Sequence, residues 1–164
     1  MEIASLGYIG INSTKLDDWD SYATGLLGMQ QVDRAGQISA FRMDDRKQRL
    51  VVTGAETDTL GFLGWEAVDA AALNRLAARL NDAGTEVKHG SSALCAERFV
   101  GELIHFSDPA GNRVEVFINP DIDTNPFVPG RPASGFKTGP VGMGPAVLKT
   151  ADVPGLLVFY RDLM

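Results

Sequence analysis

The bulk properties of this 164-residue chain exclude several classes of protein. A formal net charge of −6 disfavours a nucleic-acid or anionic-membrane surface. No apolar run approaches the roughly 18 residues that span a bilayer, and MEIASLGYIGI lacks the pattern of a signal peptide. Cys95 is the single cysteine, so no disulfide can form within one chain, and we expect a cytoplasmic protein.

An internal repeat organises the chain. Residues 6–27 align without gaps with residues 143–164, and the pattern LGYIGI returns as LGFLGW from residue 60. Leu6 therefore corresponds to Leu60, and Gly7 corresponds to Gly61. A fixed internal period indicates that one supersecondary unit has been repeated.

Each copy predicts a short apolar strand followed by an amphipathic helix. Gly28 and Gly84 end the first two helices. Three strand-like stretches follow each complete helix, so the repeated unit is βαβββ. These stretches are MQQVDR, ISAFRMD and RLVVTG after the first helix, and TEVKHG, GELIHFSD and RVEVFINP after the second.

The repeat predicts three parts of the chain. Residues 1–118 form an N-terminal domain of two modules, about 1–57 and 58–118. Residues 119–140 form a connector, because five of the eight prolines lie there and exclude a helix or central strand. Residues 141–164 are the first strand and helix of an incomplete third module.

Several stretches together resemble one family, the type I extradiol ring-cleaving dioxygenases of the dihydroxybiphenyl dioxygenase group. The resemblance implies an α+β fold of paired βαβββ modules, known as the vicinal oxygen chelate or glyoxalase/bleomycin-resistance fold. It also implies an N-terminal domain without metal, and a C-terminal domain that holds Fe(II) with two histidines and one glutamate. The matching stretches are SLGYIGI, FLGWEAVDAAAL, LIHFSDPAGNRVEVF, NPFVPG with SGFKTG, and GMGPAV with FYRDLM.

The resemblance places the iron ligands on the first and fourth strands of a module, where this chain has unsuitable residues. Aromatic rings and a neutral hydroxyl are poor ligands for a divalent ion, and proline offers no donor. We therefore expect no metal, cofactor or catalytic residue in this chain. Tyr8, Phe62, Thr53 and Phe117 occupy the pseudo-site of the first domain, and Pro145 occupies the position of the first iron histidine.

Other candidate residues form no recognisable site. His89 and His105 are expected to be surface or sheet residues. Strand alternation turns Glu115 away from Val114 and Val116, and Glu115 forms no metal-binding triad with the two histidines. Cys95 has no evident base partner, and the Ser91–Ser92 pair is expected in a loop. Arg34, Arg42, Arg46 and Arg49 are expected to be solvated.

The helix at residues 153–164 carries an apolar stripe that must be buried. It could pack on the first domain, on another chain, or on a part missing from a fragment, and we favour a homo-oligomer. Three functions remain open: a non-catalytic or truncated dioxygenase relative, inactive alone; an active Fe(II) dioxygenase completed by another chain; or a small-molecule binding module of the glyoxalase/bleomycin-resistance type. An aromatic small molecule is a possible ligand.

Overall fold

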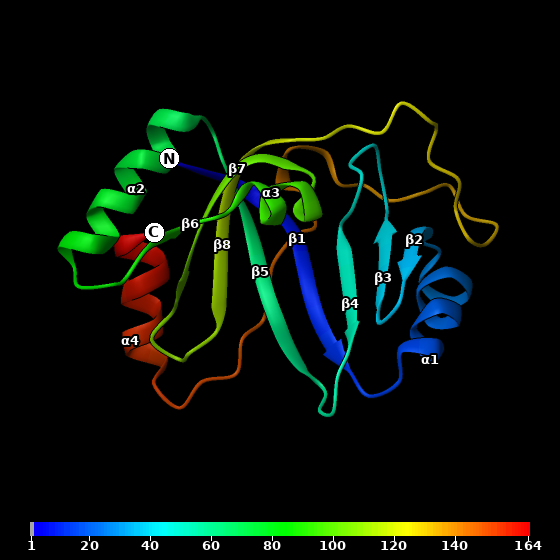
Figure 1. The fold of residues 1–164 in the computed structure, drawn as a ribbon, viewed down its shortest axis with the longest axis horizontal. Helices are drawn as coiled ribbons and strands as arrows, with labels where there is room; N and C mark the ends of the chain where they lie inside the picture. Colours follow the sequence, from blue (N-terminus) through cyan, green and yellow to red (C-terminus); the bar gives the residue numbers. More distant parts are fainter. Residues whose placement is uncertain (1) are drawn as a thin grey trace.

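A computed structural model describes residues 2–164 as one eight-stranded mixed sheet in the order β2-β3-β4-β1-β5-β8-β7-β6. The strands are β1 (Ile3–Ser13), β2 (Gln30–Ala35), β3 (Ile38–Arg42), β4 (Leu50–Gly54), β5 (Thr59–Ala67), β6 (Lys88–His89), β7 (Val100–Ser107) and β8 (Arg113–Pro120). The helices are α1 (Leu16–Ser21), α2 (Ala70–Asp82), α3 (Ser92–Arg98) and α4 (Val153–Val158), with a 3-10 turn at Gly139–Val141. Figure 1 shows α1 at one end of the sheet, and α2 and α4 at the other.

The element order repeats as βαβββ, which confirms the predicted fold class. In each module the first strand is parallel to the fourth, β1 to β4 and β5 to β8. The division near residue 57 falls between β4 and β5, whereas residue 118 falls inside β8. Within the described part of the chain, no helix is long and apolar enough to cross a membrane.

The two modules meet where β1 and β5 pair antiparallel, and the register of this pair is symmetric. Leu6 pairs with Trp65, and Ile11 pairs with Leu60. The repeat matches Leu6 with Leu60 and Ile11 with Trp65, so it converts the first pair into the second. An approximate twofold axis therefore runs between β1 and β5.

Glycines on these central strands make room for aromatic rings from the neighbouring strand. A Cβ atom on Gly64 would lie 2.1 Å from the Tyr8 ring, and one on Gly10 would lie 2.2 Å from the Phe62 ring. Tyr8 pairs with Gly64, and Gly10 pairs with Phe62. The two contacts are related by the twofold axis, so glycine is required at both places.

The opposite face of the sheet packs against the helices. The apolar face of α2 buries Leu73, Leu76 and Leu80 completely, in one cluster with Val114 and Val116 of β8. Asp69 caps this helix by accepting a hydrogen bond from the Ala72 N–H at 2.7 Å. In the first module, Leu16 and Ala23 pack with Phe41 and Val52 in the corresponding cluster.

Two local predictions about the helices need correction. Ser91 and Ser92 do not lie in a loop but begin α3: Ser91 accepts a hydrogen bond from the Leu94 N–H at 3.2 Å and caps the helix, which leaves only Lys88–His89 of the preceding stretch as strand. The helix is too short for its apolar periodicity to be evident. The first helix also changes form, because α1 continues as π-helix over Tyr22–Leu27 before Gly28 ends it at φ 82°.

The strand expected after residue 141 does not form. Within residues 2–164, this stretch forms only an isolated bridge between Leu6 and Gly142, and Val147 is 95% exposed. The physical reason lies in the symmetry: the first strands of the two modules pair with each other, and the described residues contain no further first strand for the third module.

The helix of this third module packs on its own chain. α4 continues as π-helix Phe159–Leu163, and Phe159 is buried in the cluster beneath α2. Arg79 of α2 donates to the Leu163 carbonyl at 2.7 Å, and the Tyr160 hydroxyl donates to Asp108 at 3.0 Å. The apolar stripe therefore needs no second chain, contrary to the reason given for an oligomer.

The connector is anchored by a buried arginine. Arg42 is only 1% exposed, and its guanidinium donates to the carbonyls of Asn125 and Pro126 at 3.1 and 2.7 Å. It also pairs with Asp123 at 3.3 Å. The expectation of solvated arginines is wrong here and at buried Arg49, because these side chains satisfy backbone carbonyls that would otherwise lack partners.

We expect Gly64→Ala to destabilise the protein by about 1–3 kcal/mol, since the added methyl group overlaps the Tyr8 ring and overpacking has this cost. Gly25→Ala is the matched control, because a Cβ atom there meets nothing within 4 Å. Urea unfolding measures both. Equal stability of the two variants would show that the Tyr8 ring can move without cost.

Candidate inner site

Three aromatic rings fill the inner face of the sheet at the pseudo-site. Tyr8 stacks on Phe117 with ring centroids 4.8 Å apart and an interplanar angle of 15°. It meets Phe62 edge-on at 5.8 Å. All three are buried, and they form one cluster with Val51 and Leu103.

Glu115 lies on the same face and is completely buried. The Tyr8 hydroxyl donates to its carboxylate at 2.8 Å, and Arg98 and Arg113 each donate through Nε at 2.9 Å. This role was not predicted from the sequence. A signal for it exists there, because Glu115 is two residues from Phe117 and therefore shares its face.

The strand register adds a second pair of equivalent fourth-strand positions to the pseudo-site. Val51 pairs with Gly10, and Glu115 pairs with Gly64, so these two residues are equivalent. Thr53 pairs with Asn12, and Phe117 pairs with Glu66, so these two residues also stay equivalent. The structure thus brings Tyr8, Phe62 and Phe117 together with Val51 and Glu115, and it places Thr53 near the end of β1.

Burial and charge fix the protonation of this network. Burial, followed by the negative charge of Glu115, raises the pKa of the Tyr8 hydroxyl well above its ordinary value. Burial disfavours the charge of Arg98, but Glu115 and Glu97 outweigh it, so the pKa of Arg98 lies above the ordinary value. The guanidinium of Arg98 also lies 3.9 Å from the centre of the Phe62 ring.

These residues do not fit Fe(II). The Glu115 carboxylate is already engaged by one hydroxyl and two guanidinium groups. His105 of β7 is the cross-strand neighbour of Glu115, and His89 is exposed on β6. Over residues 2–164 no group of three or more His, Cys, Asp and Glu side chains is placed to hold a metal ion. Pro145 lies exposed in the unpaired stretch after Gly142.

The hollow at the inner site leaves almost no free space for a ligand. The hollow beside Tyr8, Arg49 and Arg98 measures about 10 Å³, the least that one water molecule needs. Cys95 of α3 is half-buried against the aromatic cluster. An aromatic ligand would therefore have to displace packed side chains to enter here.

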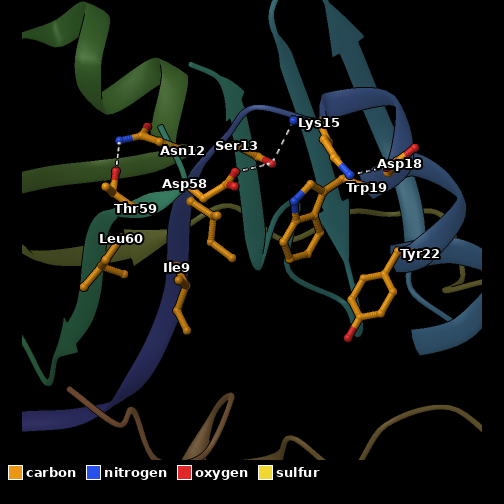
Figure 2. A pocket seen from close by; sticks show the side chains of 11 residues that line it. Ile9, Asn12, Ser13, Lys15, Asp18, Trp19, Tyr22, Asp58, Thr59 and Leu60 are labelled. Carbon is orange, nitrogen blue, oxygen red and sulfur yellow. Dashed lines mark hydrogen bonds and ion pairs between the residues drawn. The ribbon is translucent and has the colours of Figure 1, made fainter. Parts of the chain in front are cut away.

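A larger hollow lies on the opposite face, next to α1. We call it the outer groove; its volume is about 670 Å³. Figure 2 shows Ile9 and Leu60 from the central strands facing the same space as Trp19 and Tyr22 from the helix. Its polar end is tied together by hydrogen bonds from Asn12 to Thr59 and from Ser13 to Asp58. Its lining is Ile9, Ile11, Asn12, Ser13, Lys15, Asp18, Trp19, Tyr22, Asp58, Thr59 and Leu60.

Comparison with known proteins identifies relatives of this chain. A family profile described as dihydroxybiphenyl dioxygenase BphC D1 matches residues 6–54. The biphenyl-2,3-diol 1,2-dioxygenase of Sphingomonas paucimobilis is 40% identical over 161 residues, which cover 96% of this chain and 54% of that enzyme. A 1,2-dihydroxynaphthalene dioxygenase of Sphingobium xenophagum is 37% identical over 98% of this chain and 55% of that enzyme.

Solved structures are similar to nearly all of this chain and cover it with about half of their own length. A catechol 2,3-dioxygenase matches with a TM-score of 0.92 and 37% identity, over 98% of this chain and 54% of that one. A BphC described as a halotolerant catechol dioxygenase matches with a TM-score of 0.96 and 32% identity, over 99% of this chain and 55% of that one. A Mn(II)-bound glyoxalase at 16% identity and a TM-score of 0.66 shares the fold.

The paired modules define a protein of the vicinal oxygen chelate fold. Within that fold, the chain is a relative of the extradiol ring-cleaving dioxygenases of the dihydroxybiphenyl type. It spans about half the length of the curated relatives that it matches.

We expect Glu115→Gln to lower the free energy of unfolding by about 3 kcal/mol, because it removes the charge of the fully buried partner of Arg98 and leaves that guanidinium only the half-exposed Glu97. Chemical denaturation measures the change. Glu56→Gln is the control, since Glu56 is exposed. A loss no larger than that of the control would mean that Glu115 does not hold the inner site together.

The raised pKa of Tyr8 predicts that the stability of the fold decreases at alkaline pH. Its pKa is raised in the folded state, so the folded protein holds this proton more tightly than the unfolded chain, whose tyrosines titrate near pH 10. The resulting stability is complete below about pH 10 and is lost as the pH rises toward the folded pKa. Tyr8→Phe should flatten the decline in unfolding free energy above pH 10, and an unchanged slope would contradict this assignment.

Proposed function

We propose that this chain is the metal-free half of an extradiol dioxygenase, and that it frames an iron-bearing half built from further βαβββ modules. The ring-cleaving ligands would lie outside residues 1–164, so the chain alone is inactive. The substrate class would be vicinal diols on two-ring aromatic compounds. The named activities of the relatives, on biphenyl-2,3-diol and 1,2-dihydroxynaphthalene, support this class.

The proposal depends on one observation: the charge of the Glu115 carboxylate is compensated by two arginines. A metal-binding carboxylate needs free oxygen lone pairs, and here Tyr8, Arg98 and Arg113 use them. The neighbouring Phe62 and Phe117 contribute rings where the resemblance expects ligands. The inner site would therefore serve as packed core, and the half would act by positioning its partner.

The remaining surfaces support narrower proposals about partners. Val153, Leu157 and Val158 stay exposed on α4, so a homo-oligomer through residues 153–164 would use this side of the helix. An aromatic small molecule would find room in the outer groove, not in the inner hollow. The single cysteine supports a cytoplasmic setting.

Anaerobic loading with Fe(II) tests the proposal. We expect the purified chain to retain far less than one iron per molecule after desalting, and to form no yellow ring-cleavage product from 2,3-dihydroxybiphenyl. The Sphingomonas paucimobilis relative, treated in parallel, is the positive control. Stoichiometric iron together with ring cleavage by this chain alone would overturn the proposal.

A further inference from the structure

The outer face of the two central strands carries a symmetric apolar floor. Residues that lie directly opposite each other in an antiparallel pair point to the same side. β-bulges between Leu6 and Tyr8 and between Gly10 and Ile11 shift the alternation along the strands. As a result, the pairs Leu6–Trp65, Ile9–Leu63 and Ile11–Leu60 share one face. The repeat matches these residues as Leu6 with Leu60, Ile9 with Leu63, and Ile11 with Trp65.

One half of this floor is covered by residues 142–164, which we call the C-terminal arm. The Met143 N–H donates to the Leu6 carbonyl at 3.0 Å. The Tyr160 ring lies 6.5 Å from Trp65. Leu6 is consequently only 1% exposed.

The symmetry-related half is open. Leu60, the counterpart of Leu6, is only partly buried and lines the outer groove together with Ile9 and Ile11. Tyr22 on the groove wall is 44% exposed (Figure 2). The outer face thus has two equivalent apolar docking positions, and the C-terminal arm of the chain itself covers one of them.

The geometry points to a second strand-and-helix arm as the occupant of the outer groove. This inference rests on the proposed function, because the arm would belong to a fourth βαβββ module in the iron-bearing half. The chain spans 54% of the Sphingomonas paucimobilis relative, so the unmatched part is nearly as long as this chain. That length accommodates the rest of a third module and a complete fourth one, judged by modules of the size of Ile3–Gly54 and Thr59–Pro120.

The docking position that the C-terminal arm covers indicates which contacts the second arm would make. In the C-terminal arm, Leu156 and Tyr160 face Trp65 across a hollow of about 330 Å³. The corresponding floor residue of the groove is Ile11, with Trp19 and Tyr22 as the aromatic wall. An incoming amphipathic helix would place its apolar residues over this floor and wall and leave its polar side in water.

Binding in trans tests this inference. The full chain is co-expressed with the part of the Sphingomonas paucimobilis enzyme beyond the match, and the dissociation constant of the purified complex is measured by dilution. Tyr22→Lys with Leu60→Lys places two charges in the outer groove. Ile122→Lys with Val128→Lys is the matched control, because both residues are exposed in the connector.

We expect the groove variant to bind at least tenfold more weakly than the wild type, and the control variant to bind like the wild type. Thermal unfolding of each chain alone verifies the fold, and Tyr22→Lys alone serves if the double variant unfolds. Groove and control variants that bind within twofold of each other would overturn the groove assignment and leave the proposed function standing.

Two other results have separate meanings. Absence of any complex with the wild-type chain would overturn the proposed function, and the second arm with it. Self-association of the chain that Tyr22→Lys abolishes would identify a second copy as the occupant and overturn the assignment to another half.

Discussion

The contact of Tyr8 with its surroundings is the constraint on which the rest of this structure depends. Its ring occupies the space above Gly64 that any side chain would fill, and its hydroxyl binds the buried Glu115. The equivalent contact of Phe62 with Gly10 lies across the twofold axis. Because both rings need glycine on the opposite strand, they fix the register of β1 with β5 and hence the position of one module against the other.

The inner face shows how a buried carboxylate is compensated by side chains of the same chain. Glu115 supplies a carboxylate on this face, but Arg98 and Arg113 compensate its charge. A buried charge must be paired. Here the two guanidinium groups provide that pairing, and the stacking of Tyr8 on Phe117 fills the neighbouring space.

The outer face is symmetric in sequence but not in burial. The same apolar pattern lies on both sides of the axis, while the C-terminal arm covers only the side of Leu6 and Trp65. The apolar surface beside Ile11 and Leu60 stays exposed to water, which is unfavourable in free energy. This imbalance connects the fold to the proposed role of the chain as one half of a larger assembly.

The sequence by itself determined the repeat, the βαβββ order, the helix-ending glycines and the aromatic residues of the inner site, because periodicity and glycine placement are local properties of the chain. It did not reveal α3, the burial of Arg42 or the pairing of Glu115 with Tyr8 and Arg98. The missing strand after Gly142 and the packing of α4 were also decided by tertiary structure. Each depends on which distant segment supplies a partner, since a strand needs a neighbour and a buried charge needs a counter-charge.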